Sequence, residues 1–214
     1  MDIAYYIDIT HEKKCKYTNY QLAERLLREV HHLNASKAHT ENVAISLPEF
    51  ALNGVLGNRF QLFGSLNALE QLINNRDFAQ IQGLHGCSVS SVRQVPPSTE
   101  HGFYVFVRNR HHERQTKGYV ARSEDRAIRR AMMGVNVRLK NADDVLNRRD
   151  KMLASRLESE AKPLRVAMNS ASSPGEGHFY IYINAVQCSD KVVCNPNNYG
   201  LSSRKKPLAL PIIL

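Results

Sequence analysis

The order of strand-like and helical segments between residues 4 and 95 is the feature that most constrains the fold of this chain. Alternating apolar and polar side chains indicate strands, and apolar residues at helical spacing indicate helices. The patterns predict strands over Ala4–Ile9, Val43–Ser46, Arg59–Phe63 and Ser88–Val95, and helices over Asn19–Leu33 and Ser65–Ile73. This βαββαβ order is that of ferredoxin-like domains and of RNA-recognition modules. We therefore expect an α+β protein with a ferredoxin-like (RRM-like) domain over residues 1–97.

Residues 98–214 predict a second, basic α/β domain. Strands are expected over Phe103–Val107, Leu164–Met168 and Phe179–Val186, and a helix over Asp143–Glu160. A further helix is expected to begin at Ser123, whose hydroxyl can cap it.

Charge is distributed unevenly along the chain, whose formal net charge is +9. Residues 1–106 hold nine Lys/Arg and ten Asp/Glu, a net charge of −1, whereas residues 107–214 hold 20 and ten, a net charge of +10. Arg126, Arg129 and Arg130 share one face of the expected helix, because side chains three and four positions apart are neighbours there. Such a face attracts a polyanion, most often nucleic acid, through its phosphates. A merely solvated basic surface is the alternative.

Cysteines and apolar runs indicate the cellular setting. Cys15, Cys87, Cys188 and Cys194 form no CxxC pair and fit no zinc template, so we expect reduced thiols and no metal site. No apolar run approaches the roughly 18 residues that a membrane span needs, and the first residues do not have the pattern of a signal peptide. We expect a cytoplasmic protein without a membrane partner.

Two sets of side chains carry possible chemistry. His31 and His32 lie at the end of the first helix, and an imidazole exchanges a proton near neutral pH. A purely structural histidine is the alternative. Arg108 and Arg110 are expected to alternate on extended chain, where each guanidinium could contact a guanine edge.

Several short motifs resemble, in order and spacing, the CRISPR-associated repeat-processing endoribonuclease of subtype I-F (the Csy-four type). The N-terminal segments "YYIDI", "QLAERLLREVH" and "AISLPEF" resemble that family's opening strand, first helix and second strand. The position of His31, the Ser-Ala-Ser corner at 170–172, Phe179, and the tail "YGLS" that begins at Tyr199 are similar as well. The resemblance covers most of the chain.

The resemblance implies a metal-independent, cofactor-free cut at the 3′ base of a repeat hairpin by attack of the ribose 2′-OH on the adjacent phosphate. His31 would be the general base, Ser170 would hold the ribose, with Asn169 and Ser172 as alternatives, and Tyr199 would orient the imidazole. The RNA-binding residues would be Arg108, Arg110, Arg126, Arg129, Arg130 and Phe179. The partners would be the CRISPR repeat hairpin and other subunits of a type I-F surveillance complex, either defensive or transposon-associated.

The sequence departs from the family pattern at a few positions. Met133 and Gly134 stand where the family's helix carries further arginines, so we expect phosphate contacts that are either fewer or supplied by Arg114, Arg138 or Lys140. A non-catalytic subunit that only holds the hairpin has the same composition and is the alternative function. A basic DNA-binding or ribosomal-type module is a third hypothesis.

Overall fold

A computed structural model describes residues 3–36, 41–97, 99–114, 117–133, 162–169, 178–189, 192–203 and 207–214. Compactness divides the chain into two units, and each is described by itself. The first unit comprises Met1–Arg108 together with Leu164–Leu214, and the second comprises Asn109–Pro163. In the described ranges no helix combines the length and the apolar character needed to cross a membrane.

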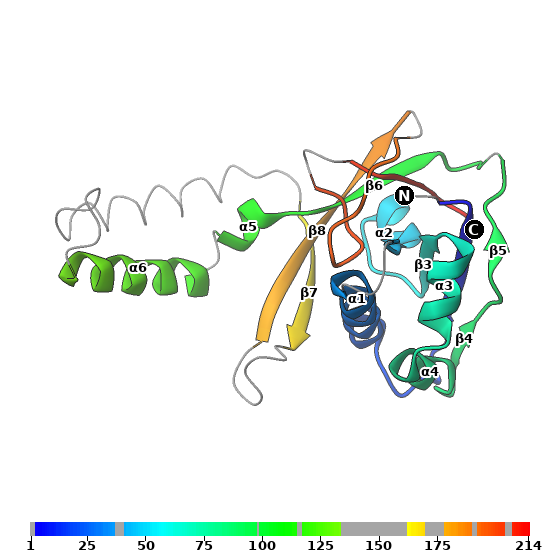
Figure 1. Ribbon diagram of the computed structural model, residues 1–214, viewed down its shortest axis with the longest axis horizontal. Coiled ribbons are helices and arrows are strands. Elements are labelled where there is room, and N and C mark those ends of the chain that lie inside the picture. The colour runs from blue at the N-terminus through cyan, green and yellow to red at the C-terminus, as the bar shows by residue number, and fades with distance from the viewer. Residues whose placement is uncertain are drawn as a thin grey trace. The chain divides into compact units, whose positions relative to one another are not determined.

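The described strands of the first unit form two antiparallel sheets (Figure 1). The first sheet has the order β2-β3-β1-β4, with β5 also paired to β1. Its strands are β1 (Tyr5–His11), β2 (Ala44–Ser46), β3 (Arg59–Gly64), β4 (Cys87–Val89) and β5 (Arg93–Gln94). The mixed α+β class is therefore confirmed, and the N-terminal β-α-β elements are compatible with the expected fold.

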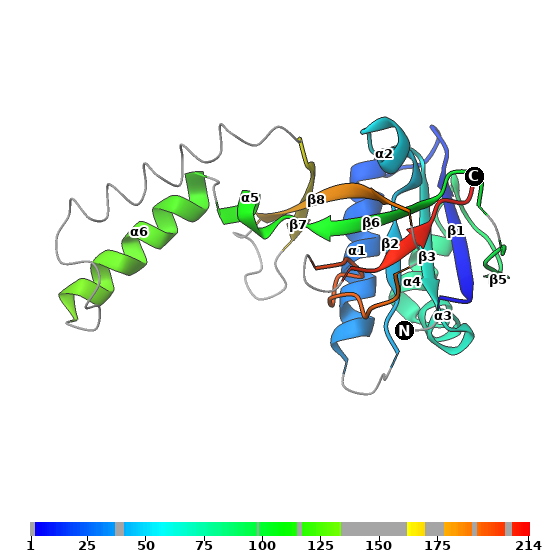
Figure 2. The same cartoon turned by 90° about the horizontal axis from the view of Figure 1, so that it is seen from above.

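The second sheet has the order β7-β8-β6-β9, and Figure 2 shows β9 beside β6. Its strands are β6 (Phe103–Arg108), β7 (Leu164–Asn169), β8 (His178–Cys188) and β9 (Ala209–Pro211). The predicted domain boundary after residue 97 falls between the strands of the two sheets. As a statement about independent domains it stays a prediction.

Four helices accompany these sheets in the first unit, counted over the described residues. They are α1 (Asn19–Ala35), α2 (Pro48–Asn53), α3 (Leu66–Ile73) and α4 (Arg76–Gln82). In Figure 1 α1, α3 and α4 lie together, and α1 contacts both β2 of the first sheet and β7 of the second. Helix α1 therefore links the two sheets.

The sequence of α1 explains its start and its burial. Thr18 and Gln21 form a capping box, in which the Thr18 side chain accepts a hydrogen bond from the Gln21 backbone and the Gln21 side chain accepts one from the Thr18 backbone. The buried side chains of the helix include two acids, Glu24 and Glu29. Arg28 neutralises both, with Nη1 at 3.2 Å from Glu24 Oε1 and Nε at 3.5 Å from Glu29 Oε1.

The second unit holds α5 (Arg110–Arg114) and α6 (Lys117–Met132) among its described residues. The expected start of a helix at Ser123 is wrong, because α6 begins six positions earlier and Ser123 lies within it. Val120 and Ala127, seven positions apart and therefore on one side of the helix, are both buried, so α6 has an apolar face that begins before Ser123. The expected helix over Asp143–Glu160 lies outside the described residues.

The expected single strand Ser88–Val95 is two strands, β4 and β5. Ser90 interrupts the ladder, because its hydroxyl, instead of a backbone carbonyl, accepts the hydrogen bond from the Asp8 N–H at 3.0 Å. Sequence patterns also missed α2, α4, α5 and β9.

Candidate functional site

His31 lies near the C-terminal end of α1 and stacks on Tyr199. The two ring centroids are 4.3 Å apart and the ring planes differ by 10°. These residues are 168 positions apart in the sequence, so tertiary contacts alone bring them together. The structure thus pairs the expected general base with the residue expected to orient it.

The turn at residues 197–201 presents Tyr199, and Asn197 organises it. The Asn197 side-chain oxygen accepts hydrogen bonds from the backbone N–H of Tyr199 at 2.8 Å and of Leu201 at 3.4 Å. The Gly200 N–H donates to the Asn197 carbonyl at 2.9 Å, and the Asn197 N–H donates to the Leu201 carbonyl at 2.8 Å. An asparagine that bonds the backbone of following residues fixes a tight turn locally.

Gly200 fixes how closely this turn approaches α1 and β2. Its φ is 72°, a left-handed conformation that favours glycine. A Cβ at this position would lie 2.8 Å from Val30 Cγ1 and 3.0 Å from the Val43 carbonyl oxygen. The Gly200 carbonyl in turn accepts a hydrogen bond from the Ile45 N–H at 3.0 Å. The absence of a side chain at residue 200 therefore lets Tyr199 reach the His31 ring.

Asn34 ties the end of α1 to the start of β2. Its Nδ2 donates to the Val43 carbonyl at 2.8 Å, and its Oδ1 accepts from the Val43 N–H at 2.8 Å. The Nδ2 atom also lies 3.5 Å from the Asn197 carbonyl oxygen. Asn34, one turn beyond His31, therefore hydrogen-bonds both to Val43, just before β2, and to the turn that carries Tyr199.

Arg108, the last residue of β6, lies over the Tyr199 ring, with Cζ 5.0 Å from the ring centroid. Attraction between a guanidinium and an aromatic face is favourable at this distance. The backbone supports the arrangement, because the Ser202 N–H donates to the Phe106 carbonyl at 2.7 Å and Val107 forms a parallel bridge with Ser202. The turn that carries Tyr199 is thereby joined to the strand that carries Arg108.

The environment of His31 lowers the pKa of its imidazole from 6.5. Burial contributes most, and the positive charges of His32 and Arg108 act in the same direction, whereas a hydrogen bond with the Asn198 backbone raises the pKa. The His31 Nδ1 atom is buried and has no hydrogen-bond partner among the described residues. The ring is therefore mostly neutral at pH 7 and able to accept a proton.

The other expected site residues lie in several places. Ser170 and Ser172 lie outside the described residues, while Asn169 ends β7 with an exposed side chain. Phe179 lies in β8, opposite Met168 of β7, and is half-buried against the hydrophobic core. Arg110 begins α5, so the expectation that it continues the extended chain from Arg108 is wrong.

Arg126, Arg129 and Arg130 are exposed on α6, in the second unit. Arg122 is exposed one turn before Arg126, and the Arg126 Nε atom donates to the Arg122 carbonyl at 3.1 Å. Starting the helix at Lys117 adds this fourth arginine to the basic face. The expected helix began at Ser123 and therefore did not include Arg122.

Asn34, Asn197 and Gly200 are supporting residues that the sequence patterns missed. The run of asparagines before Tyr199 and Gly200 was a signal for a tight turn. Nothing in the local sequence of α1 showed that Asn34 would bond to β2, since this contact depends on the packing of distant segments.

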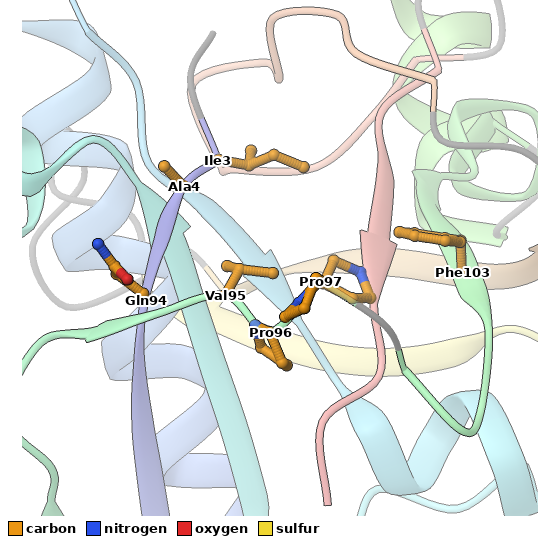
Figure 3. A pocket seen from close by; sticks show the side chains of 8 residues that line it. Ile3, Ala4, Gln94, Val95, Pro96, Pro97 and Phe103 are labelled. Atoms are coloured by element: carbon orange, nitrogen blue, oxygen red, sulfur yellow. The ribbon is translucent and has the colours of Figure 1, made fainter.

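A cavity of about 300 Å³ opens elsewhere in the first unit (Figure 3). Val95, Pro96, Pro97 and Phe103 line it, and its other lining residues bring no nucleophile or titratable side chain. All four cysteines are free, and the described residues contain no group of three or more metal-ligating side chains.

Comparison with known proteins adds one finding. A family model described as CRISPR-associated protein (Cas_Csy4) matches residues 6–212. No curated protein matches the chain. The family match includes every residue of the stacked cluster described above.

Gly200→Ala should destabilise the protein more than Gly54→Ala, by about 1–3 kcal/mol of unfolding free energy. Both glycines have a φ of 72°, but a Cβ at Gly54 meets nothing within 4 Å, so Gly54→Ala measures the backbone strain alone. Urea unfolding of the two variants gives the difference. Equal destabilisation would show that the turn can move away from Val30 at no cost.

Arg108→Gln should raise the pKa of His31, because it removes one of the positive charges that lower it. NMR titration of the imidazole resonances measures the change, and Arg93→Gln, an exposed substitution in β5, is the control. An unchanged His31 pKa in Arg108→Gln would contradict the assignment.

The lowered pKa of His31 also affects the pH dependence of stability, because the unfolded chain binds this proton first as the pH falls below 6.5. The contribution of His31 to stability is therefore present above pH 6.5 and is lost as the pH falls toward the folded-state pKa.

Proposed function

The chain belongs to the CRISPR-associated Csy4 family, whose members process CRISPR RNA, and we propose that it is a sequence- and structure-specific endoribonuclease. It cleaves CRISPR precursor RNA at the 3′ base of the repeat hairpin. The observation that carries this proposal is the stack of His31 on Tyr199 beneath Arg108, which joins a proton acceptor to a ring that can orient it and to a guanidinium suited to contact RNA.

The proposed reaction is an attack of the ribose 2′-OH on the adjacent phosphate. His31 takes the 2′-OH proton, and the lowered pKa of its ring favours the neutral form that this step requires. Tyr199 holds the imidazole plane by stacking, and Ser170 holds the ribose. The products are a 2′,3′-cyclic phosphate and a 5′-hydroxyl. Proton transfer and positioning are the only contributions that the step requires, so we propose a metal-independent and cofactor-free mechanism.

The proposed grip on the hairpin combines base contacts and phosphate contacts. Arg108 and Arg110 read base edges, and Phe179 stacks on the base pair at the foot of the stem. The exposed arginines of α6 contact phosphates, since side chains rarely read base edges in the narrow major groove of an RNA helix. Arg108 would then exchange its contact with Tyr199 for one with the RNA.

The wider proposal concerns the fold and the assembly. The antiparallel strand order β2-β3-β1-β4, with α1 after β1 and α3 and α4 after β3, supports a ferredoxin-like N-terminal domain. The protein keeps its cleaved hairpin and joins a type I-F guide-RNA surveillance complex in the cytoplasm, where the precursor is transcribed.

His31→Ala should slow cleavage of a repeat hairpin in EDTA by about 10²–10⁴-fold, because it removes the proton acceptor. Hairpin affinity should stay within a few-fold, and His85→Ala, an exposed histidine before β4, is the control. Single-turnover cleavage of labelled RNA and a binding titration measure the two quantities. Wild-type protein that binds tightly without cutting would instead favour the non-catalytic hairpin-binding subunit, and activity lost in EDTA would favour a metal nuclease.

Substituting glutamine for Arg126, Arg129 and Arg130 together should weaken hairpin binding and reduce its salt dependence. The slope of log K against log salt should fall by roughly one unit for each phosphate that the variant no longer neutralises. Binding titrations across a range of salt concentrations measure it. The paired variant Arg76→Gln with Arg93→Gln, exposed arginines of the first unit, is the control for a general change in charge. A slope equal to that of the wild type would remove α6 from the RNA interface.

A further inference from the structure

Cleavage by 2′-OH attack needs two proton transfers. One proton leaves the attacking 2′-OH, and another must reach the 5′-oxygen as its bond to phosphorus breaks, because an alkoxide is a poor leaving group in water. The proposed function assigns His31 to the first transfer and assigns no residue to the second. A proton donor is therefore expected on the far side of the scissile phosphate.

His32 lies at a suitable distance from His31. The two ring centroids are 6.2 Å apart, and the ring planes are tilted by 48°. Hydrogen bonds of about 2.8 Å to oxygens on opposite sides of one phosphorus place two proton-transfer groups on the order of 6–8 Å apart. The separation of the two ring centroids is close to this range, so the two imidazoles are near enough for one phosphate to reach both.

The surroundings of the two histidines differ although they are adjacent in the sequence. His31 is half-buried under Tyr199, whereas the His32 side chain is 49% exposed and so open to a substrate. The His32 Nδ1 atom lies 4.0 Å from Glu29 Oε2, and the Glu29 side chain is only 6% exposed. The buried carboxylate thus lies on the Nδ1 side of the ring, which leaves Nε2 as the nitrogen for a ligand.

We infer that His32 is the general acid of the reaction and donates its Nε2 proton to the leaving 5′-oxygen. This inference rests on the proposed function. In the step, the O2′–P bond forms and the P–O5′ bond breaks. The 2′-OH proton moves to His31, the His32 proton moves to O5′, and exchange with water then restores both rings.

The charged groups around His31 and His32 are consistent with His31 as the base and His32 as the acid. On α1, Glu29 faces His32, and Arg28 contacts Glu29 at 3.5 Å. From other elements, Arg108 of β6 and Tyr199 of the 197–201 turn face His31. A positive charge on His32 also lowers the pKa of His31, so a protonated donor favours an unprotonated acceptor beside it.

The test replaces the leaving oxygen by sulfur. A hairpin with a 5′-bridging phosphorothiolate at the cut site expels a thiolate, which needs no proton because thiols are far more acidic than alcohols. His32→Gln should cut the normal hairpin at least about 10²-fold more slowly than wild type and cut the sulfur substrate within a few-fold of wild type. His31→Gln should stay slow on both substrates, and His85→Gln should match wild type on both.

A pH–rate profile of the wild-type protein tests the same assignment without a variant. The normal hairpin should lose rate at high pH, because its leaving oxygen needs a proton from a general acid, and the sulfur substrate should not. His32→Gln that cuts the normal hairpin at the wild-type rate, or that sulfur does not rescue, overturns the inference while the proposed function stands. Wild-type protein that cuts neither substrate overturns the proposed function and this inference with it.

Discussion

The burial of α1 between two antiparallel sheets is the constraint on which the site depends. Contacts with β2 and β7 bury most faces of this helix, including two acids that a lone amphipathic helix would expose. Arg28 makes that burial tolerable by pairing with both carboxylates. Because the helix is held on several sides, its packing fixes where His31 lies beside Tyr199.

Sequence patterns located the elements whose own side chains form the core. The alternation in β1 and the apolar face of α1 are local consequences of burial, so their positions are close to those expected. Elements that depend on partners were missed. Strand β9 is three residues long and exists because β6 pairs with it, and α2 begins at Pro48, which suits either the end of a strand or the first turn of a helix.

The candidate site was predictable only in part for the same reason. His31 and Tyr199 were identified through short motifs that resemble a family, because no periodicity relates residues so far apart. Their stacking depends on Gly200, whose role is visible only when the distances to Val30 and Val43 are known. Arg110 was misplaced, since a polar segment after a strand is equally compatible with extended chain and with the helical turn it forms.

Consecutive residues of a helix differ by about 100° in direction, and this geometry separates the properties of His31 and His32. One ring faces the turn that carries Tyr199 and loses hydration, which lowers its pKa. The other faces solvent beside a buried carboxylate. Two chemically identical side chains in different surroundings can take the different roles of an acid and a base that the proposal assigns to them. The packing that buries α1 therefore also creates the asymmetry on which the two proposed proton transfers rest.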